Sequence, residues 1–330
     1  MKLFFLSTSS VLAVALAPQS GAPSPQVVRV PTRWSAGSKW VYERTKERVD
    51  VRNGEPRSAG RGIVPIEVEV LESGEGASAL RWTYGKLKLE SMPSLAGAPA
   101  EVKEALSKLQ DLSSGLAMEF NTDSGGVPVS VRNAKPLFDK AMEAFDAAMT
   151  QLKAAGMPEA QLQALGGSAR QSLTADLFAS SMIREPRILH YFCGRTVSVG
   201  GAEESDSEIG SPLGTGTLKA RLRLAGEPVE GAPNEVRIQF QLRIDPASAK
   251  AVVEDIFARA NSRGGAPTSL PADAPPIELS DRGTARLDLT TGLPIEIEHT
   301  RTFEMLGQKR IDKIQFRRLE GAASKPAKKE

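Results

Sequence analysis

The sequence predicts an α+β protein with one or more large, curved antiparallel sheets, built from two related β-β-α-β-β halves, and a central helical block packed on one face. Long segments alternate apolar and polar residues with a period of two, which is typical of strands with one buried face. A central stretch changes to the longer period of amphipathic helices. With 330 residues, 40% of them hydrophobic, the chain can bury a sizeable core.

The first 22 residues have the layout of a secretory signal peptide. An apolar run near the start leads to Ala15 and Ala17, which form an A-x-A cleavage pattern. The run is shorter than the roughly 20 residues that a membrane-spanning helix needs. Pro18 and Pro23 follow the two candidate cleavage positions, so the cleavage site stays open, and an uncleaved anchor is the alternative. We expect export to the periplasm or the extracellular space, with no transmembrane span once the signal is removed.

Residues 23–33 form a linker rich in Pro, Ser and Gly that we expect to be disordered. The first β-rich half, 34–134, follows it. Its alternating segments flank Asn53–Gly54, a dipeptide typical of a type I′ hairpin turn, and a third segment completes an antiparallel meander. Valine and leucine then recur at helical spacing within 99–112, which predicts the one helix of this half.

The central segment, 135–190, is predicted to be helical. Gly156 with Pro158, and then Gly166–Gly167, divide it into about three helices. Its apolar residues at helical spacing are expected to lie in the core: Phe138, Met142, Phe145, Met149 and Leu152.

The second β-rich half, 191–320, contains the clearest alternation in the chain. From Val236 to Ile244, apolar residues alternate with Arg and Gln, and the preceding strand does the same, so the two are predicted to form a hairpin. Asp245–Pro246 is typical of a helix start, with Asp as the N-cap and Pro in the first turn. Three more alternating segments follow, and residues 321–330 form a basic tail that we expect to be disordered.

Short motifs recur in the two halves at similar spacing. GGVPVSV at 125–131 is similar to TGLPIEI at 291–297, and SAG at 35–37 is similar to SVG at 198–200. In each half a hairpin precedes a helix, and a second hairpin with G-x-P in its turn follows. A duplication of one unit would explain this pattern. Chance similarity between short turn motifs is the alternative.

Two further motifs frame the β-rich part of the chain: G-x-x-W at Gly37 and Trp40, and TG-x-P at Thr291, Gly292 and Pro294. The chain resembles uncharacterised bacterial exported proteins that combine these motifs. With its long antiparallel strands, it also resembles the lipoprotein-carrier half-barrel proteins of bacterial envelopes. The resemblance covers residues 30–320 at the level of architecture. It implies a curved sheet crossed by helices and transfers no functional residue.

Cysteine and histidine are too scarce for the common metal and redox sites. Cys193 is the only cysteine, so the chain can form no internal disulfide, and its apolar neighbours indicate a buried, inert thiol. A disulfide-linked dimer or a reactive thiol is the alternative. His190 and His299 are the only histidines, too few for an imidazole-based zinc site. We therefore expect neither a metal nor a cofactor.

Catalytic and nucleotide-binding motifs are also absent from the sequence. It contains no G-x-S-x-G elbow, no G-x-x-x-x-G-K-[ST] loop and no complete G-x-G-x-x-G. Its 42 Lys and Arg balance 40 Asp and Glu, so no basic face is predicted for nucleic acid. No catalytic constellation can be assigned.

The strand expected at 293–305 carries an unexpected polar pair, His299 and Arg301, on a face that should point to the core. The apolar residues of that face include Ile295, Ile297 and Phe303. A β-bulge near Thr300 would turn the pair to solvent, and a strand that outruns the core would also expose it. In the third explanation the face lines a cavity, where Arg301 could grip an anionic head group while the three apolar residues contact an apolar body.

Export, missing catalytic motifs and helices rich in Met, Ala and Phe favour a non-catalytic envelope protein. It would bind an apolar or amphipathic ligand, such as a lipid, between sheet and helices. The alternative is a structural or protein-interaction module that docks an envelope protein and binds no small ligand. The basic residues on the polar face of the central hairpin would support this docking: Arg221, Arg223, Arg237 and Arg243. An exported hydrolase would need two carboxylates with shifted pKa values in a cleft.

Overall fold

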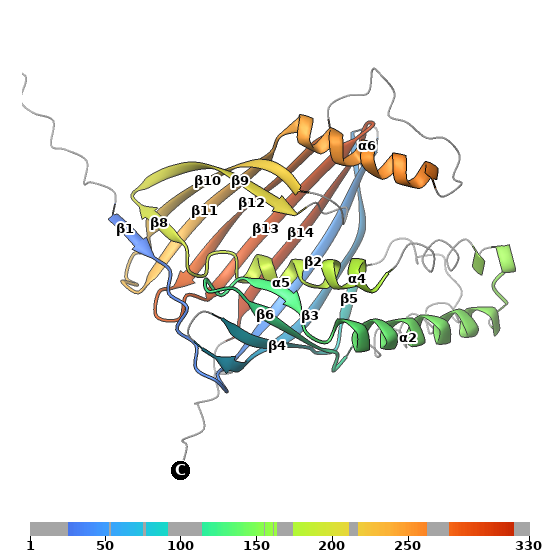
Figure 1. Ribbon diagram of the computed structural model, residues 1–330, viewed down its shortest axis with the longest axis horizontal. Coiled ribbons are helices and arrows are strands. Elements are labelled where there is room, and N and C mark those ends of the chain that lie inside the picture. The colour runs from blue at the N-terminus through green and yellow to red at the C-terminus, as the bar shows by residue number, and fades with distance from the viewer. Residues whose placement is uncertain are drawn as a thin grey trace, which may run out of the picture.

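The computed structural model has an α+β fold dominated by one large, open and mostly antiparallel sheet, which confirms the predicted fold class (Figure 1). The structure describes residues 26–52, 54–74, 77–91, 114–154, 156–160, 162–163, 174–210, 217–262 and 277–319. Within these residues, 14 strands belong to the same sheet.

The strands are β1 (Gln26–Arg29), β2 (Lys39–Arg52), β3 (Glu55–Ser73), β4 (Ser78–Tyr84), β5 (Lys88–Ser91), β6 (Ala117–Thr122), β7 (Pro128–Val131), β8 (Thr196–Val199), β9 (Gly201–Gly210), β10 (Thr217–Pro228), β11 (Glu235–Ile244), β12 (Glu278–Asp288), β13 (Pro294–Met305) and β14 (Gln308–Arg318). Their order across the sheet is β1-β8-β10-β11-β12-β13-β14-β2-β3-β4-β6-β7, with β5 beside β3 and β9 beside β10. Because β14 pairs with β2, the last of the described strands joins the two β-rich halves into one sheet.

The period-two alternation places the buried face of each long strand as expected. Every second residue of β11 from Val236 to Ile244 is buried, and the residues between them are exposed or half-buried. The predicted turn between β2 and β3 is also present. Gly54 has a φ of 78°, which an L-residue rarely adopts, and Arg52 pairs with Glu55 across it.

The segment before β2 differs from the expected disordered linker at 23–33. β1 pairs antiparallel with β8 at one edge of the sheet, and Val30 after it is fully buried. The β-branched pair Val27–Val28 suits a strand, which the Pro/Ser/Gly composition of the wider segment obscures.

The two halves place equivalent strands in the same order. β3, β4, β6 and β7 are neighbours in one half, and β10, β11, β12 and β13 are neighbours in the other. The recurring motifs also have matching backbones, since Gly126 and Gly292 in the G-x-P turns have φ values of 84° and 79°. Gly37, shortly before β2, and Gly200, directly before β9, have φ values of 81° and 85°. The helix predicted at 99–112 lies outside the described residues.

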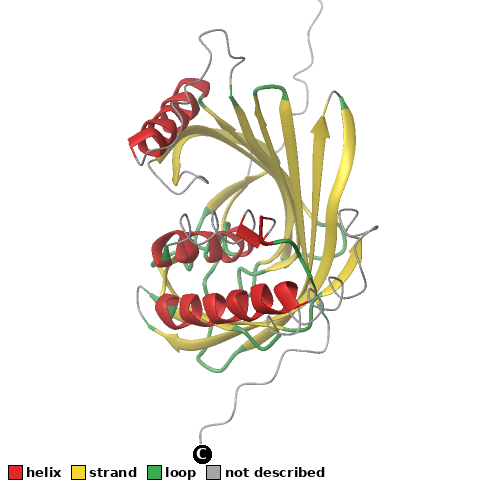
Figure 2. Cartoon of the chain, turned by 90° about the vertical axis from the view of Figure 1, so that its right-hand side faces the viewer, coloured by secondary structure: helices red, strands yellow, loops and turns green. Residues whose placement is uncertain are grey.

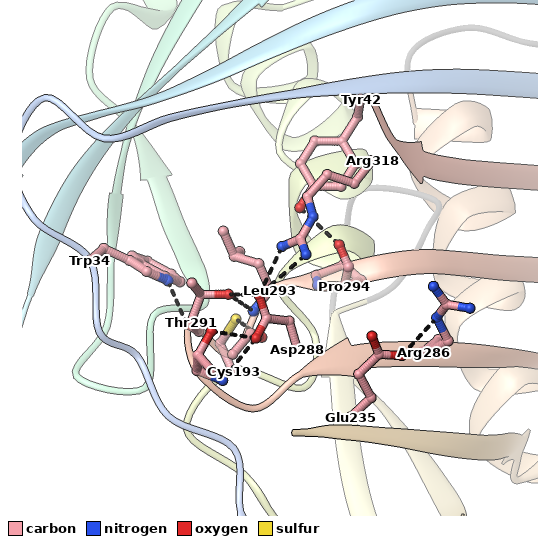
Figure 3. A network of polar contacts seen from close by, with 12 residues as sticks. Trp34, Tyr42, Cys193, Glu235, Arg286, Asp288, Thr291, Leu293, Pro294 and Arg318 are labelled. Atoms are coloured by element: carbon pink, nitrogen blue, oxygen red, sulfur yellow. Dashed lines mark hydrogen bonds and ion pairs between the residues drawn. The ribbon is translucent and has the colours of Figure 1, made fainter. Parts of the chain in front are cut away.

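The second G-x-P turn is held by residues 31–42, which lie between β1 and β2 or at the start of β2 (Figure 3). Trp34 Nε1 donates to the carbonyl of Thr291, and the Tyr42 hydroxyl donates to the carbonyl of Pro294, both at 2.9 Å. A Cβ atom at Gly292 would lie 1.6 Å from the carbonyl oxygen of Pro31. Only glycine therefore fits here, because the backbone needs both a positive φ and a close approach to residue 31.

The described helices are α2 (Ala134–Ala154), α4 (Ala175–Met182), α5 (Arg184–Leu189) and α6 (Pro246–Ser262). They lie on the concave side of the sheet (Figure 2). Asp245 caps α6 as predicted, since its Oδ2 accepts from the Ser248 amide at 2.8 Å. Gly156, with a φ of 83°, follows the end of α2. The expected break at Gly166–Gly167 lies outside the described residues.

The stripe predicted as core on α2 is only partly buried. Leu152 is buried, whereas Phe138 and the stripe residues between them are half-buried. The reason is that α2 packs against α4, where the rings of Phe138 and Phe178 lie 5.8 Å apart, and not directly against the centre of the sheet.

Candidate functional site

The concave face of the sheet changes from apolar to charged along its central strands. Ala285, Ile297 and Phe316 lie directly opposite one another on β12, β13 and β14, and all three are buried. Farther along the same strands, the residues facing one another are Asp281, Arg301 and Asp312. His299 and Arg301 thus belong to a surface that changes from apolar to charged along these strands.

The charged end of this surface is a row of alternating sign across four neighbouring strands, formed by Asp281, Arg301, Asp312 and Arg48 in that order. Arg301 binds Asp281 through two hydrogen bonds, from Nε to Oδ1 at 2.6 Å and from Nη2 to Oδ2 at 2.5 Å. Arg48 Nε donates to Asp312 Oδ1 at 3.0 Å, and Arg310 Nε donates to the same oxygen at 3.2 Å. Such charge-assisted bonds fix the row.

Helix α5 adds a second charged cluster above the sheet. The Glu185 carboxylate accepts hydrogen bonds from Arg44 Nη1 and from Lys46 Nζ, the latter at 2.8 Å. Arg184, the neighbouring residue, makes no ion pair with a described residue, and its buried Nε has no hydrogen-bond partner. Arg184 therefore has carboxylates nearby but no direct ion pair among the described residues.

A cavity of about 1000 Å³ lies between the sheet and helices α4 and α5. Its volume matches the upper end of the range of about 300–1,000 Å³ for small-molecule sites. Its apolar wall includes residues of both layers: Val64, Tyr84, Leu87, Leu177, Met182, Ile188, Phe240, Leu242, Ile297 and Ile314.

The charged residues of the cavity are mostly cationic, with eight Lys or Arg side chains against four Asp or Glu among the lining residues. Burial opposes ionisation of Asp281, but hydrogen bonds from Arg301 and His299 outweigh it and hold its pKa well below the usual range. Burial also favours a raised pKa for Glu185, but the cations Arg44 and Lys46 outweigh it and lower the pKa of this carboxyl. Burial, with Arg301 nearby, lowers the pKa of Arg184 to about 10.

The structure brings three of the five predicted ligand-binding residues to this cavity. Ile297, His299 and Arg301 line it, and His299 is only 5% exposed. The pairing of β12 with β13 is regular through Thr300, so the bulge expected there is wrong. The strand does not outrun the core, because His299 is buried. The placement of the pair is the one that the cavity explanation expects.

Ile295 and Phe303 are half-buried and do not line the cavity. A register shift does occur in this strand, but it lies at its start. Leu287 pairs with Pro294 and Arg286 pairs with Glu296, which leaves Ile295 without a partner on β12. The bulge breaks the simple alternation that had placed Ile295 on the inward face.

His299 is held in the cavity wall by two neighbours. Its ring stacks on Phe240 with centroids 6.1 Å apart, and Nε2 lies 3.5 Å from Asp281 Oδ2. Its buried Nδ1 has no hydrogen-bond partner.

Most of the charged site residues are not evident as a cluster in the sequence. Arg44, Lys46 and Arg48 follow Tyr42 at every second position, which is the same change from apolar to charged that β13 shows. That pattern could have been recognised. Arg184 and Glu185 give no such signal, because only the packing of α5 brings them over the sheet.

His190 and Cys193 lie in the core, away from the charged row. Cys193 Sγ is 4.0 Å from His190 Nδ1 and 3.5 Å from the carbonyl oxygen of Gly292. Burial raises the pKa of the Cys193 thiol and lowers the pKa of His190 to about 3. Neither group is ionised near neutral pH, and a buried neutral thiol is unreactive.

In the described part of the chain, no three His, Cys, Asp or Glu side chains come together as metal ligands. No helix there combines the length and apolar character needed to cross a bilayer.

Comparisons with known proteins do not identify a family for this chain. No protein-family model matches the chain, and no curated protein matches it by sequence. Among solved structures it is similar to one described as "Lipid-protein interactions in lipovitellin", with a TM-score of 0.38 and 10% identity. The match covers 90% of this chain but 26% of the lipovitellin chain, so the protein spans about a quarter of that chain's length.

Proposed function

We propose that this protein is exported and binds an apolar or amphipathic molecule in the cavity between its sheet and helices α4 and α5, without catalysing a reaction. The observation that carries the proposal is the graded cavity wall, apolar around Ile297 and charged around Arg301. An amphiphile matches such a wall, because its chain gains from leaving water while its head group stays with polar partners. The signal-like N-terminus supports export to the cell envelope.

A neutral fluorescent probe, N-phenyl-1-naphthylamine, tests this proposal. The protein is expected to bind the probe, and Leu177→Glu is expected to weaken binding about tenfold, because a carboxylate replaces an apolar contact worth roughly 1.5–3 kcal/mol. Leu177 lines the cavity from α4, three residues after the N-cap Thr174. Glutamate at this position completes a capping box, so the helix should tolerate it.

Two controls separate the cavity from general effects of mutation. Leu177→Met keeps the apolar contact and should bind the probe as the wild type does. Val27→Glu adds the same charge at a residue that is 64% exposed on β1, and should also leave binding unchanged. No probe binding by the wild type, or equal binding by Leu177→Glu, would contradict the proposal.

A docking role for the convex face is the second candidate. Arg221 on β10 lies directly opposite Arg243 on β11, and both are exposed. Like charges in a cross-strand pair repel each other. Asp206 Oδ1 lies 3.7 Å from Arg221 Nε and offsets part of that repulsion. An acidic partner protein would relieve the rest, and pull-down of such a partner together with failure of probe binding would favour this role.

A further inference from the structure

Arg184 lines the cavity without a direct ion pair to a described residue, although Glu185, Asp281 and Asp312 lie near enough to oppose the lowering of its pKa by burial. Its Nε is buried and without a hydrogen-bond partner, and no described residue forms an ion pair with its guanidinium. A guanidinium stays charged at neutral pH, and burying it is costly unless an anion accompanies it.

The neighbouring carboxylates are already engaged. Glu185 binds Arg44 and Lys46, Asp312 binds Arg48 and Arg310, and Asp281 binds Arg301 and lies beside His299. Three carboxylates thus face six cationic side chains when Arg184 is included. The cluster has an excess of positive charge that no described side chain neutralises.

The exposed fractions of the cationic side chains indicate the side from which an anion would enter the cavity. The side chains of Lys46, Arg48 and Arg310 are 40%, 42% and 41% exposed, whereas that of Arg301 is 13% exposed. An anion entering from solvent would meet the exposed cations first and would reach Arg184 after losing its water. Such a route attracts anions and strengthens their binding at the inner position.

We propose that Arg184, together with the excess cations of the charged row, forms a subsite for a phosphate group carried by the amphipathic ligand. This inference rests on the proposed function. Phosphate suits the subsite better than a carboxylate, because a phosphomonoester carries a charge of about −1.5 to −2 and three acceptor oxygens. A guanidinium fork matches those oxygens with two parallel hydrogen bonds. Arg301 already donates its Nε and Nη2 hydrogens to Asp281. It therefore holds the charged row in place and is not the main ligand of the anion.

Displacement of the naphthylamine probe by two amphiphiles with the same chain tests this subsite. Monododecyl phosphate is expected to displace the probe at concentrations at least tenfold lower than 1-dodecanol does. Arg184→Met should remove this preference by weakening the phosphate at least tenfold, with dodecanol changed less than twofold. Arg184→Lys should restore part of the preference, since it restores the charge without the fork. Arg223→Met, on the exposed convex face, is the matched control and should keep the full preference.

The outcomes separate this inference from the proposed function. If neither amphiphile displaces the probe, the proposed function fails. If both displace it equally, or if Arg184→Met weakens both equally, the cavity binds amphiphiles but the phosphate subsite is refuted. Inorganic phosphate distinguishes the source of the anion. If phosphate raises the unfolding temperature of the wild type but not of Arg184→Met, the subsite binds free phosphate. If phosphate does not raise the unfolding temperature of the wild type, the subsite is assigned to a lipid head group.

The unfolding temperature of the ligand-free protein distinguishes a ligand-binding role of Arg184 from a role in stabilising the fold. Arg184→Met removes a half-buried guanidinium whose buried Nε has no hydrogen-bond partner and keeps the aliphatic bulk, so its unfolding temperature should rise by about 2–4 °C. A fall of that size would mean that Arg184 stabilises the fold, and would overturn the assignment to ligand binding.

Discussion

Replacing Asp281 with alanine is expected to lower the free energy of unfolding by about 3–5 kcal/mol. Asp281 is 7% exposed, and its carboxylate accepts both hydrogen bonds from Arg301. Without it, the Arg301 guanidinium stays buried next to Arg184 with no bidentate partner. Urea unfolding of the two proteins at neutral pH measures the difference.

Two variants control this experiment. Asp206→Ala removes a carboxylate whose side chain is 91% exposed on β9, and should change stability by less than about 0.5 kcal/mol. The double variant Asp281→Leu with Arg301→Met replaces the pair by apolar side chains, and should recover most of the loss. A cost below about 1 kcal/mol for Asp281→Ala would show that the pair is hydrated and that the charged row is not a buried feature.

Acidification is expected to destabilise the protein through His190. This residue is 1% exposed, and its ring lies 5.3 Å from that of Trp34, 6.4 Å from that of Trp82 and 6.2 Å from that of Phe120. Burial in this aromatic site lowers its pKa from 6.5 to about 3. The unfolded chain therefore binds a proton below pH 6.5 that the folded chain excludes, so stability is full above pH 6.5 and falls as the pH drops towards 3.

The expected loss is about 2–3 kcal/mol between pH 6.5 and 4.5, and about 4–5 kcal/mol by pH 3. The comparison with His190→Leu isolates His190, because the lowered pKa values of Asp281, Asp288, Asp312 and Glu185 add the same acid dependence to both proteins below about pH 5. Urea unfolding at pH 6.5, 5.5 and 4.5 should show a free energy of unfolding that falls with pH in the wild type, and this fall should be largely missing in His190→Leu. An equal fall in the two proteins would show that His190 is not buried in its neutral form.

The predictable part of the fold comes from local patterns. Strict alternation places β10 and β11, Gly54 lies in the turn between β2 and β3, and Asp245 caps α6 at the expected residue. The site required information that is not local. β14 and β2 pair although more than 250 residues separate Arg310 from Asp50, and this pairing is what places Asp312 beside Arg48. No periodicity in either strand predicts which strand will be its neighbour.

The two polar residues of β13 show how much of the site could be predicted from the sequence. The sequence identified His299 and Arg301 as anomalous, and the cavity explanation anticipated their burial. Their partner Asp281 lies on β12, on a face whose alternation runs Leu279, Asp281, Gly283 and therefore looks irregular by itself. Gly283 is small for a reason that only the structure shows, because a Cβ there would lie 1.9 Å from the Glu298 carbonyl oxygen and 2.7 Å from Phe240.

The most direct measurement of ligand binding is native mass spectrometry of the mature chain, exported to a bacterial periplasm and purified without detergent. We predict a mass in excess of the polypeptide that disappears after extraction with organic solvent and returns on incubation with a lipid extract. A bare polypeptide mass, together with no uptake from the lipid extract, would contradict the proposal that the cavity between the sheet and helices α4 and α5 binds an amphiphile.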